Sequence, residues 1–160
     1  MAIKVGEKIP DVTLKTMTAD GIKDIPTREL FGGKRVVLFA LPGAFTPTCS
    51  AKHLPGFIER ADEIKKKSVD RIVCLSVNDA FVMGAWAKAQ NAGDKVLLVA
   101  DGNAEFSSAV GLAFDGSGFG MGTRSQRYAM IVQDGVVKSL FVEKPMEFKV
   151  SSAEAVLAAL

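Results

Sequence analysis

The stretch "RVVLFALPGAFTPTCS", residues 35–50, carries the strongest indication of the fold. Apart from its first residue, the segment 35–41 is a continuous apolar run between Gly-Gly and Pro-Gly, which is typical of a central strand buried on both faces. Two prolines and two threonines follow, and from Cys49 onward the spacing of apolar residues is helical. We therefore expect Cys49 to lie where a buried strand ends and a helix begins.

The other segments alternate between strand and helix patterns, without internal repeats. Strands are expected at 11–18, 71–77 and 95–100, and a hairpin over 127–143 with its turn at Asp134-Gly135. Helices are expected at 27–31, 49–67 with a kink at Pro55, 80–90, 103–111 and 152–160. The glycine-rich segment 115–125 is expected to be a loop that shapes the rim of a pocket. This order predicts one α/β domain over residues 1–160, with helices on both faces of a central sheet.

The composition is ordinary for a globular protein: 48% of the 160 residues are hydrophobic, 24% are charged, and the net charge is +2. This balance favours neither nucleic acid nor a membrane surface as a partner. No run reaches about 18 apolar residues, and the first ten residues do not resemble a signal peptide. Two cysteines do not form a disulfide scaffold, so we expect a reducing compartment and a cytoplasmic protein.

The setting of Cys49 favours thiol chemistry, because ligand sites in open α/β sheets gather at the carboxyl ends of strands. A free thiol is only about 3% ionised at neutral pH. Making it mostly thiolate takes roughly 3 kcal/mol, whereas a helix N-terminus contributes about 0.3 to 2 kcal/mol. A reactive cysteine here therefore needs a nearby cation as well. The alternative is that Cys49 is a small buried hydrophobic residue.

Four segments together resemble the peroxiredoxins: "PGAFTPTC" (42–49), "HLPGF" (53–57), "CLSVNDAFVMGAW" (74–86) and "TRSQRYAMIVQDG" (123–135). The resemblance covers nearly the whole chain and falls in the branch with plant type II and mammalian atypical two-cysteine peroxiredoxins. It implies a thioredoxin-like fold with a central mixed sheet. It also implies cofactor-free, thiol-dependent reduction of hydrogen peroxide, alkyl hydroperoxides and peroxynitrite.

The resemblance also assigns residues to roles. The peroxidatic cysteine of the family matches Cys49, its motif proline and threonine match Pro42 and Thr46, and its arginine from a distant strand matches Arg127. Arg127 would supply the cation that the thiolate requires, and Thr46 would hydrogen-bond the peroxide. Pro42 would shield the thiolate from water, and backbone N–H groups at Thr48 and Cys49 would orient the substrate.

Other residues carry weaker indications. Phe119 is expected to give apolar cover to the substrate. Arg124 braces Arg127, contacts a subunit partner or binds substrate, or else it is a solvated surface residue. His53 is the only histidine, and we expect it to form structural hydrogen bonds beside the pocket, because it has too few companions for a metal site. Met83 and Trp86 are expected in the core.

The way in which oxidised Cys49 is recycled is also predicted from the sequence. Cys74 lies 25 residues after Cys49 (74 − 49), the spacing of the second cysteine in the plant branch. However, Cys74 is expected mid-strand, about 10 Å below the sheet edge, whereas a disulfide needs Cα atoms within about 7 Å. We therefore expect glutathione with glutaredoxin, or thioredoxin, to act on Cys49, with Cys74 a buried thiol of secondary importance.

Two other functions and one assembly state complete these expectations. A thioredoxin-like disulfide oxidoreductase is disfavoured, because no cysteine follows Cys49 at the usual spacing of three residues. A peroxide sensor or chaperone-like redox protein using the same cysteine is the other alternative. The family commonly forms homodimers, and we expect one here.

Overall fold

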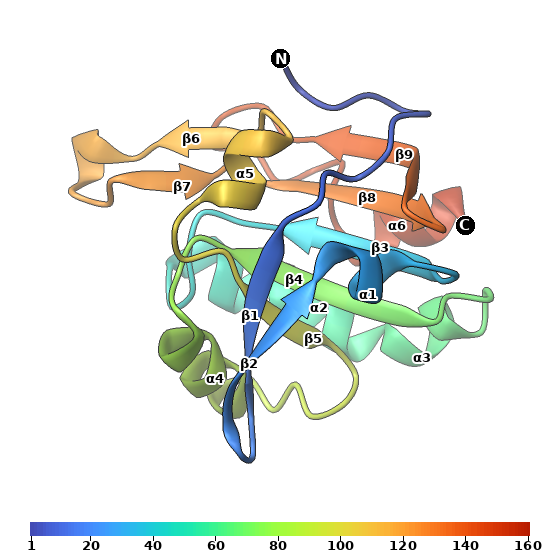
Figure 1. The fold of residues 1–160 in the computed structure, drawn as a ribbon, viewed down its shortest axis with the longest axis horizontal. Coiled ribbons are helices and arrows are strands. Elements are labelled where there is room, and N and C mark those ends of the chain that lie inside the picture. Colours follow the sequence, from blue (N-terminus) through green and yellow to red (C-terminus); the bar gives the residue numbers. More distant parts are fainter.

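The computed structural model describes all residues, 1–160, and contains a mixed sheet of seven strands and a second sheet of two strands (Figure 1). The strands are β1 (Thr13–Thr18), β2 (Gly21–Pro26), β3 (Arg35–Ala40), β4 (Arg71–Ser76), β5 (Leu97–Ala100), β6 (Ala113–Asp115), β7 (Thr123–Ser125), β8 (Tyr128–Gln133) and β9 (Val136–Val142). The order in the large sheet is β2-β1-β5-β4-β3-β8-β9, and β6 pairs with β7.

Helices cover both faces of the large sheet. They are α1 (Thr27–Phe31), α2 (Leu54–Glu59), α3 (Ala61–Lys65), α4 (Ala80–Ala89), α5 (Glu105–Ala109) and α6 (Ala153–Ala159). Side chains of α1 and α5 join the core on one face, and those of α2, α3, α4 and α6 join the core on the other. The expected α/β architecture is therefore confirmed. None of these helices is both long and apolar enough to cross a bilayer.

The central strands are the apolar runs found in the sequence, and they set the position of the site. β3 runs parallel to β4, with Phe39 opposite Cys74, and β4 runs parallel to β5. β8 lies antiparallel on the other side of β3, so that Tyr128 pairs with Ala40. Because parallel strands end at one edge of the sheet, the loops that follow β3, β4 and β5 meet there. β8 begins at that same edge.

Local signals in the sequence located several elements well. The hairpin of β8 and β9 turns at Asp134 and Gly135, whose φ angles of 47° and 75° suit the two-residue turn that favours strand twist. Ser152 caps α6 by accepting a hydrogen bond from the backbone N–H of Ala155 at 3.1 Å. Met83 and Trp86 are fully buried, as expected.

The helix expected over residues 49–67 is not one regular helix. Residues Cys49–His53 form a π-helical turn, in which the Leu54 N–H donates to the Cys49 carbonyl five residues earlier. The wider turn comes directly before Pro55, which has no N–H with which to continue the α-helical ladder. A second break, at Arg60, separates α2 from α3.

The loop expected over residues 115–125 is confirmed for 116–122, but its two ends belong to strands that were not predicted. β6 and β7 form a small hairpin here, which projects beyond the edge of the large sheet at the left of Figure 1. Its tip contains a 3-10 turn, Ser117–Phe119, followed by glycines with φ near 70° and 65° at Gly120 and Gly122. Strands of three residues are too short to show an alternating pattern, so the glycines dominated the sequence signal.

Candidate active site

A loop leads from the carboxyl end of β3 to Cys49, which is the first residue of the π-helical turn. The side chain of Cys49 is fully buried. The neighbouring Ser50 is tied to helix α4 by two hydrogen bonds. Trp86 Nε1 donates to the Ser50 hydroxyl, and Gln90 Nε2 donates to the Ser50 carbonyl, each at 3.1 Å. These bonds hold the π-helical turn, and with it the cysteine, against α4.

Arg127 provides a cation beside this thiol. It directly precedes β8, and the pairing of β8 with β3 brings it to the end of β3 although it is 78 residues away in the sequence. Arg127 Nη2 donates to Cys49 Sγ at 3.2 Å, and Nη1 donates to His53 Nδ1 at 2.9 Å. The guanidinium therefore joins the only histidine to one of the two cysteines.

His53 is held as a neutral acceptor. Its Nε2 lies 2.9 Å from the Ser151 carbonyl oxygen, which can only accept, so Nε2 carries the proton and Nδ1 accepts from Arg127. The imidazole packs between the rings of Phe39 and Phe148, with centroids 4.9 and 5.0 Å away. Burial and the neighbouring Arg127 charge lower the pKa of His53 to about 3, despite the bond to Ser151. This placement matches the structural role that we expected.

The loop between β3 and Cys49 is shaped by its own hydrogen bonds and by Asn78, which lies in the connection after β4. The Thr46 hydroxyl donates to the Gly43 carbonyl at 2.6 Å, which leaves its oxygen free to accept. The Ala44 N–H donates to Asn78 Oδ1 at 3.0 Å, and the Ser76 hydroxyl donates to the same oxygen at 2.5 Å. Asn78 therefore fixes the loop from the end of β4.

Arg124 braces the same loop from the β6–β7 hairpin. Its Nε donates to the Met121 carbonyl at 2.9 Å, and its Nη1 donates to the Pro42 carbonyl at 3.4 Å. A Cβ on Gly43 would lie 2.8 Å from this Nη1 atom, so only glycine leaves room for the guanidinium. Arg124 is thus half-buried against the loop and does not brace Arg127 directly.

Thr48 and Phe119 occupy different surroundings. Thr48 is half-buried and is the N-cap residue of the π-helical turn, immediately before Cys49. The Phe119 side chain is 68% exposed on the tip of the β6–β7 hairpin, where it forms no hydrogen bond and no ring contact with the residues around Cys49. The hairpin brings Met121 and Arg124 to the loop instead.

Cys74 shares the core with Cys49 but has no comparable partner. It lies in β4 opposite Phe39, fully buried, and no side chain donates a hydrogen bond to its sulfur. Burial raises the pKa of the Cys74 thiol well above its usual value, Cys49 raises it further, and Arg127 offsets this only in part. Cys74 is therefore protonated at neutral pH.

The sequence analysis missed residues that support the site. Asn78 follows β4 at the sheet edge where ligand-binding loops gather, and this position was a signal that could have found it. Glu143 had no such signal, because a single carboxylate after a strand is usually solvated. Side chains of His, Cys, Asp and Glu nowhere form a group of three or more that could hold a metal ion.

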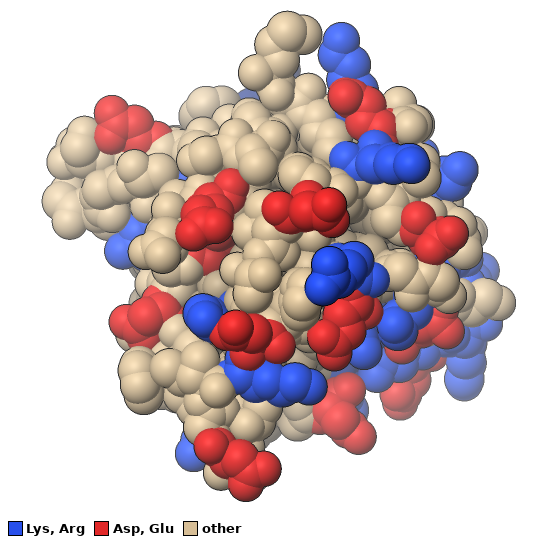
Figure 2. Space-filling view, viewed as in Figure 1, with Lys and Arg blue, Asp and Glu red and all other residues tan.

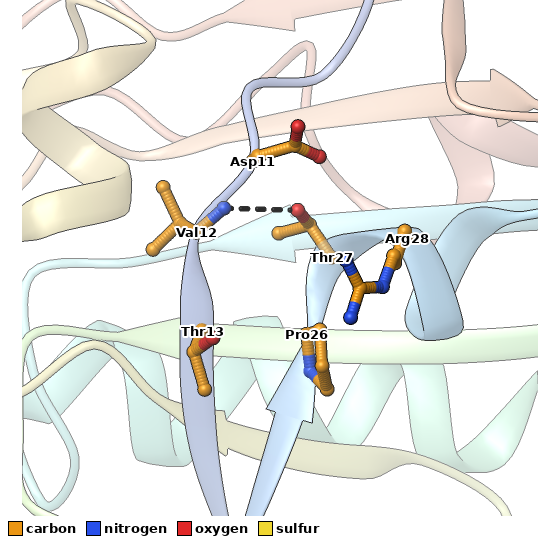
Figure 3. Close-up of a pocket in the computed structure, with 6 residues that line it drawn as sticks. All are labelled: Asp11, Val12, Thr13, Pro26, Thr27 and Arg28. Carbon is orange, nitrogen blue, oxygen red and sulfur yellow. Dashed lines mark hydrogen bonds between the residues drawn. The ribbon is translucent and has the colours of Figure 1, made fainter.

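One surface pocket lies away from the two cysteines. This pocket of about 120 Å³ lies between the start of β1 and the end of β2, where Val12 N donates to the Thr27 hydroxyl at 3.1 Å (Figure 3). Neither cysteine lines it. Figure 2 shows acidic and basic side chains interspersed over the viewed face, without an extended patch of one sign. Neither this pocket nor a charged patch marks the buried thiol of Cys49.

The fold and the site together define a cysteine-based oxidoreductase with a central mixed sheet. Comparison with known proteins makes this specific. The Redoxin family profile matches residues 4–157. The chain is 54% identical to peroxiredoxin-2E-2, chloroplastic, of Oryza sativa over 163 residues, covering 99% of this chain and 72% of that protein. It is 47% identical to peroxiredoxin-2B of Arabidopsis thaliana, covering 99% and 98%.

A solved structure gives the same result. Reduced Prx3 from Vibrio vulnificus in complex with hydrogen peroxide superposes with a TM-score of 0.95 at 57% identity, covering 98% of each chain. The chain belongs to the peroxiredoxin family, and its relatives include plant type II peroxiredoxins. It is accordingly a thiol-dependent peroxidase with a thioredoxin-like fold.

Proposed function

We propose that Cys49 reduces hydrogen peroxide and alkyl hydroperoxides, and peroxynitrite as well. The observation that carries the proposal is the 3.2 Å contact between Arg127 Nη2 and Cys49 Sγ. A fixed guanidinium favours the thiolate over the thiol and offers donors to an oxygen that becomes negative. The similar Vibrio vulnificus protein was solved with hydrogen peroxide bound, which supports this substrate class.

The proposed step is an in-line displacement. The Cys49 thiolate attacks one peroxide oxygen, a sulfur–oxygen bond forms, and the oxygen–oxygen bond breaks. The sulfur is oxidised to a sulfenic acid, and the departing hydroxide or alkoxide takes a proton from water. Arg127 stabilises the charge on the departing oxygen.

The loop supplies the remaining groups. The Thr46 oxygen accepts from the peroxide, because its own proton is committed to the Gly43 carbonyl. Backbone N–H groups at Thr48 and Cys49 orient the substrate, and Pro42 limits the access of water to the sulfur. Phe119, exposed at the tip of the β6–β7 hairpin, gives apolar cover to larger alkyl hydroperoxides.

We infer that an external thiol recycles Cys49. A first thiol attacks the sulfenic sulfur to give a mixed disulfide and water, and a second thiol releases Cys49 as the thiolate. Glutathione with glutaredoxin, or thioredoxin, fits this scheme, which requires a reducing compartment such as the cytoplasm. The protonated and buried state of Cys74 argues against an internal route.

The test of the peroxidase step is thiol loss in the reduced protein after addition of one equivalent of peroxide. Completion within about a second at micromolar concentration is expected, whereas an unactivated thiol with a pKa near 8.5 needs many minutes. A slow reaction would contradict the proposed substrates and favour a disulfide oxidoreductase. A fast reaction without turnover by glutathione with glutaredoxin, or by thioredoxin, would favour a sensor.

Recycling is tested with a Cys74→Ser variant and both reductants. Turnover close to that of the wild type is expected with at least one of them. Loss of turnover with both, together with a Cys49–Cys74 disulfide in the oxidised wild type by mass spectrometry, would make Cys74 the resolving residue.

We further propose a homodimer that packs through the face around Cys49. Exposed aromatic rings lie at the Cys49 end of the sheet: Phe45 follows β3 and is 57% exposed, and Phe81 follows β4 and is 68% exposed. The nearby β6–β7 hairpin is mostly uncharged in Figure 2 and carries Phe119, which is also 68% exposed. Sedimentation should show a dimer that Phe81→Asp dissociates, and a monomeric wild type would contradict the proposal.

A further inference from the structure

Glu143 is a buried carboxylate that the peroxidase step as described does not use. It directly follows β9, and only 7% of the residue is exposed. One carboxylate oxygen, Oε2, accepts four hydrogen bonds: from the backbone N–H groups of Lys149, Val150 and Ser151 at 2.7, 2.9 and 2.9 Å, and from the Ser151 hydroxyl at 2.7 Å. The chain after β9 is therefore folded back onto this side chain.

The ionised state of this carboxylate is favoured by its partners. Burial by itself raises the pKa of Glu143, but the hydrogen bonds from Ser151, Lys149 and Val150 outweigh burial and hold the pKa below its usual value. A carboxylate that accepts several backbone N–H groups is a strong organising centre for a loop. Without it, three backbone donors in this segment would lose their acceptor.

The segment that Glu143 holds contacts the catalytic arginine in two ways. The ring of Phe148 lies over the Arg127 guanidinium, with its centroid 5.8 Å from Cζ. The Ser151 carbonyl accepts from His53 Nε2 at 2.9 Å, and the His53 Nδ1 atom then accepts from Arg127 Nη1 at 2.9 Å. Both contacts therefore depend on where the chain between residues 148 and 151 lies.

Glu143 also contacts the arginine through the backbone. Its N–H donates to the Arg127 carbonyl at 3.0 Å, because β9 ends beside the start of β8 (Figure 1). The main chain of Arg127 and the segment that orients its side chain are thus attached to one residue. A residue that served only to cap this loop would contact the loop segment but not the backbone of Arg127.

We propose that Glu143 is the positioning residue of the catalytic arginine, acting through the Ser151 carbonyl and His53 to aim the Arg127 guanidinium at Cys49. Only one predicted result, the change in the rate of peroxide reduction, rests on the proposed peroxidase function. The predicted change in the ionisation and alkylation of Cys49 requires no peroxide.

The experiment compares Glu143→Gln with Asp101→Asn. Asp101 is a matched control: it too is buried, and it accepts hydrogen bonds from Phe106 N, Ser107 N and the Ser107 hydroxyl at 3.0, 2.8 and 2.8 Å, but it caps α5. Both variants are made in a Cys74→Ser background, so that ultraviolet thiolate absorbance and iodoacetamide alkylation report Cys49 alone.

Glu143→Gln should lower the thiolate fraction of Cys49 at neutral pH and slow both alkylation and peroxide reduction by about tenfold, the scale of losing a charge-assisted hydrogen bond. Asp101→Asn should lower the melting temperature by a similar amount while its rates stay within about twofold of the background, since the side-chain hydrogen bonds of Asp101 go to the start of α5 and not to the residues that position Arg127. Equal kinetic effects of the two variants would overturn the proposal and leave Glu143 as a structural cap.

A double-mutant cycle then asks whether Glu143 acts through Arg127. In an Arg127→Ala background, Glu143→Gln should change the rates by less than about twofold, because its target is gone. A further tenfold loss there would show an independent role and contradict the proposal. If Glu143→Gln does not fold, Ser151→Ala removes one of the four bonds and keeps the carbonyl, and a rate within error of the background would equally count against it.

The measurements separate this inference from the proposed function. A wild-type protein that does not react with peroxide but whose Cys49 ionisation depends on Glu143 would refute the peroxide substrates and keep the positioning role. Rapid peroxide reduction at a rate that Glu143→Gln does not change would support the peroxide substrates and refute the positioning role.

Discussion

Cys49 and Cys74 are both fully buried in the same hydrophobic core, yet their surroundings differ in one decisive respect. Cys74 lies within a strand and has no hydrogen-bond donor, and burial raises its pKa. Cys49 lies beyond the end of a strand and accepts a hydrogen bond from a guanidinium. Cys74 is therefore a buried thiol without a polar partner, whereas Cys49 is a buried sulfur held beside a fixed cation.

The contrast between the two cysteines is tested most directly by removing each sulfur in turn. Cys49→Ser should abolish peroxide reduction, since a serine hydroxyl is not ionised at neutral pH. The matched Cys74→Ser variant should react with peroxide within about twofold of the wild-type rate, because the uncharged buried thiol takes no part in the step. Stopped-flow peroxide consumption measures both. A Cys74→Ser variant that is inactive while folded would contradict the contrast.

The second prediction concerns the group that holds the cation. His53 is neutral with a pKa of about 3 in the folded protein, against 6.5 as its ordinary value. Between these values the unfolded chain binds the proton and the folded protein does not, so stability is full above about pH 6.5 and is lost as the pH falls toward 3. The expected loss is up to about 5 kcal/mol in the free energy of unfolding.

Urea unfolding across this pH range, compared with a His53→Asn variant, isolates the contribution of the histidine. The variant should be less stable at neutral pH but should lose less stability on acidification. Parallel curves for the two proteins would show that His53 titrates as it does in the unfolded chain.

Removing the Arg127 cation should make the surroundings of Cys49 resemble those of Cys74. Arg127→Ala should slow peroxide reduction by at least about a hundredfold, or about 2.7 kcal/mol, the scale of losing one preorganised donor. Thiolate absorbance should fall together with the rate, and Arg127→Lys should restore part of the charge but not the two-point contact. A nearly full rate in Arg127→Ala would refute its assigned role.

The smallest expected effect concerns the loop that covers Cys49 and has no equivalent at Cys74. Thr46→Val keeps the shape but removes the oxygen that donates to Gly43 at 2.6 Å and is free to accept from the substrate. Loss of such hydrogen bonds predicts a rate about tenfold lower. Thr46→Ser is the control and should recover most of the rate. Unchanged kinetics in Thr46→Val would leave Thr46 with a purely conformational role.

Much of the fold could be predicted from local patterns. The apolar runs located β3 and β4, the Asp134-Gly135 pair located the last hairpin, and the helix expected over 152–160 is α6. The elements that were missed or misread are those in which local signals conflict. In the β6–β7 hairpin, four glycines lie between two strands of three residues each, and before Pro55 the missing N–H produces a π-helical turn that spacing alone does not show.

Sequence patterns alone place Cys49 between a buried strand and a helix and require a cation beside a reactive thiol there. Those conclusions depend on neighbours along the chain and on the intrinsic energetics of a thiol. How that cation is aimed follows from contacts between residues that are far apart in the sequence. Arg127 meets Cys49 because β8 pairs with β3, and its direction depends on His53 and on the chain held by Glu143. Hydrogen bonds between residues so distant in sequence leave no periodic pattern, because their geometry is set by strand register and packing and not by spacing along the chain.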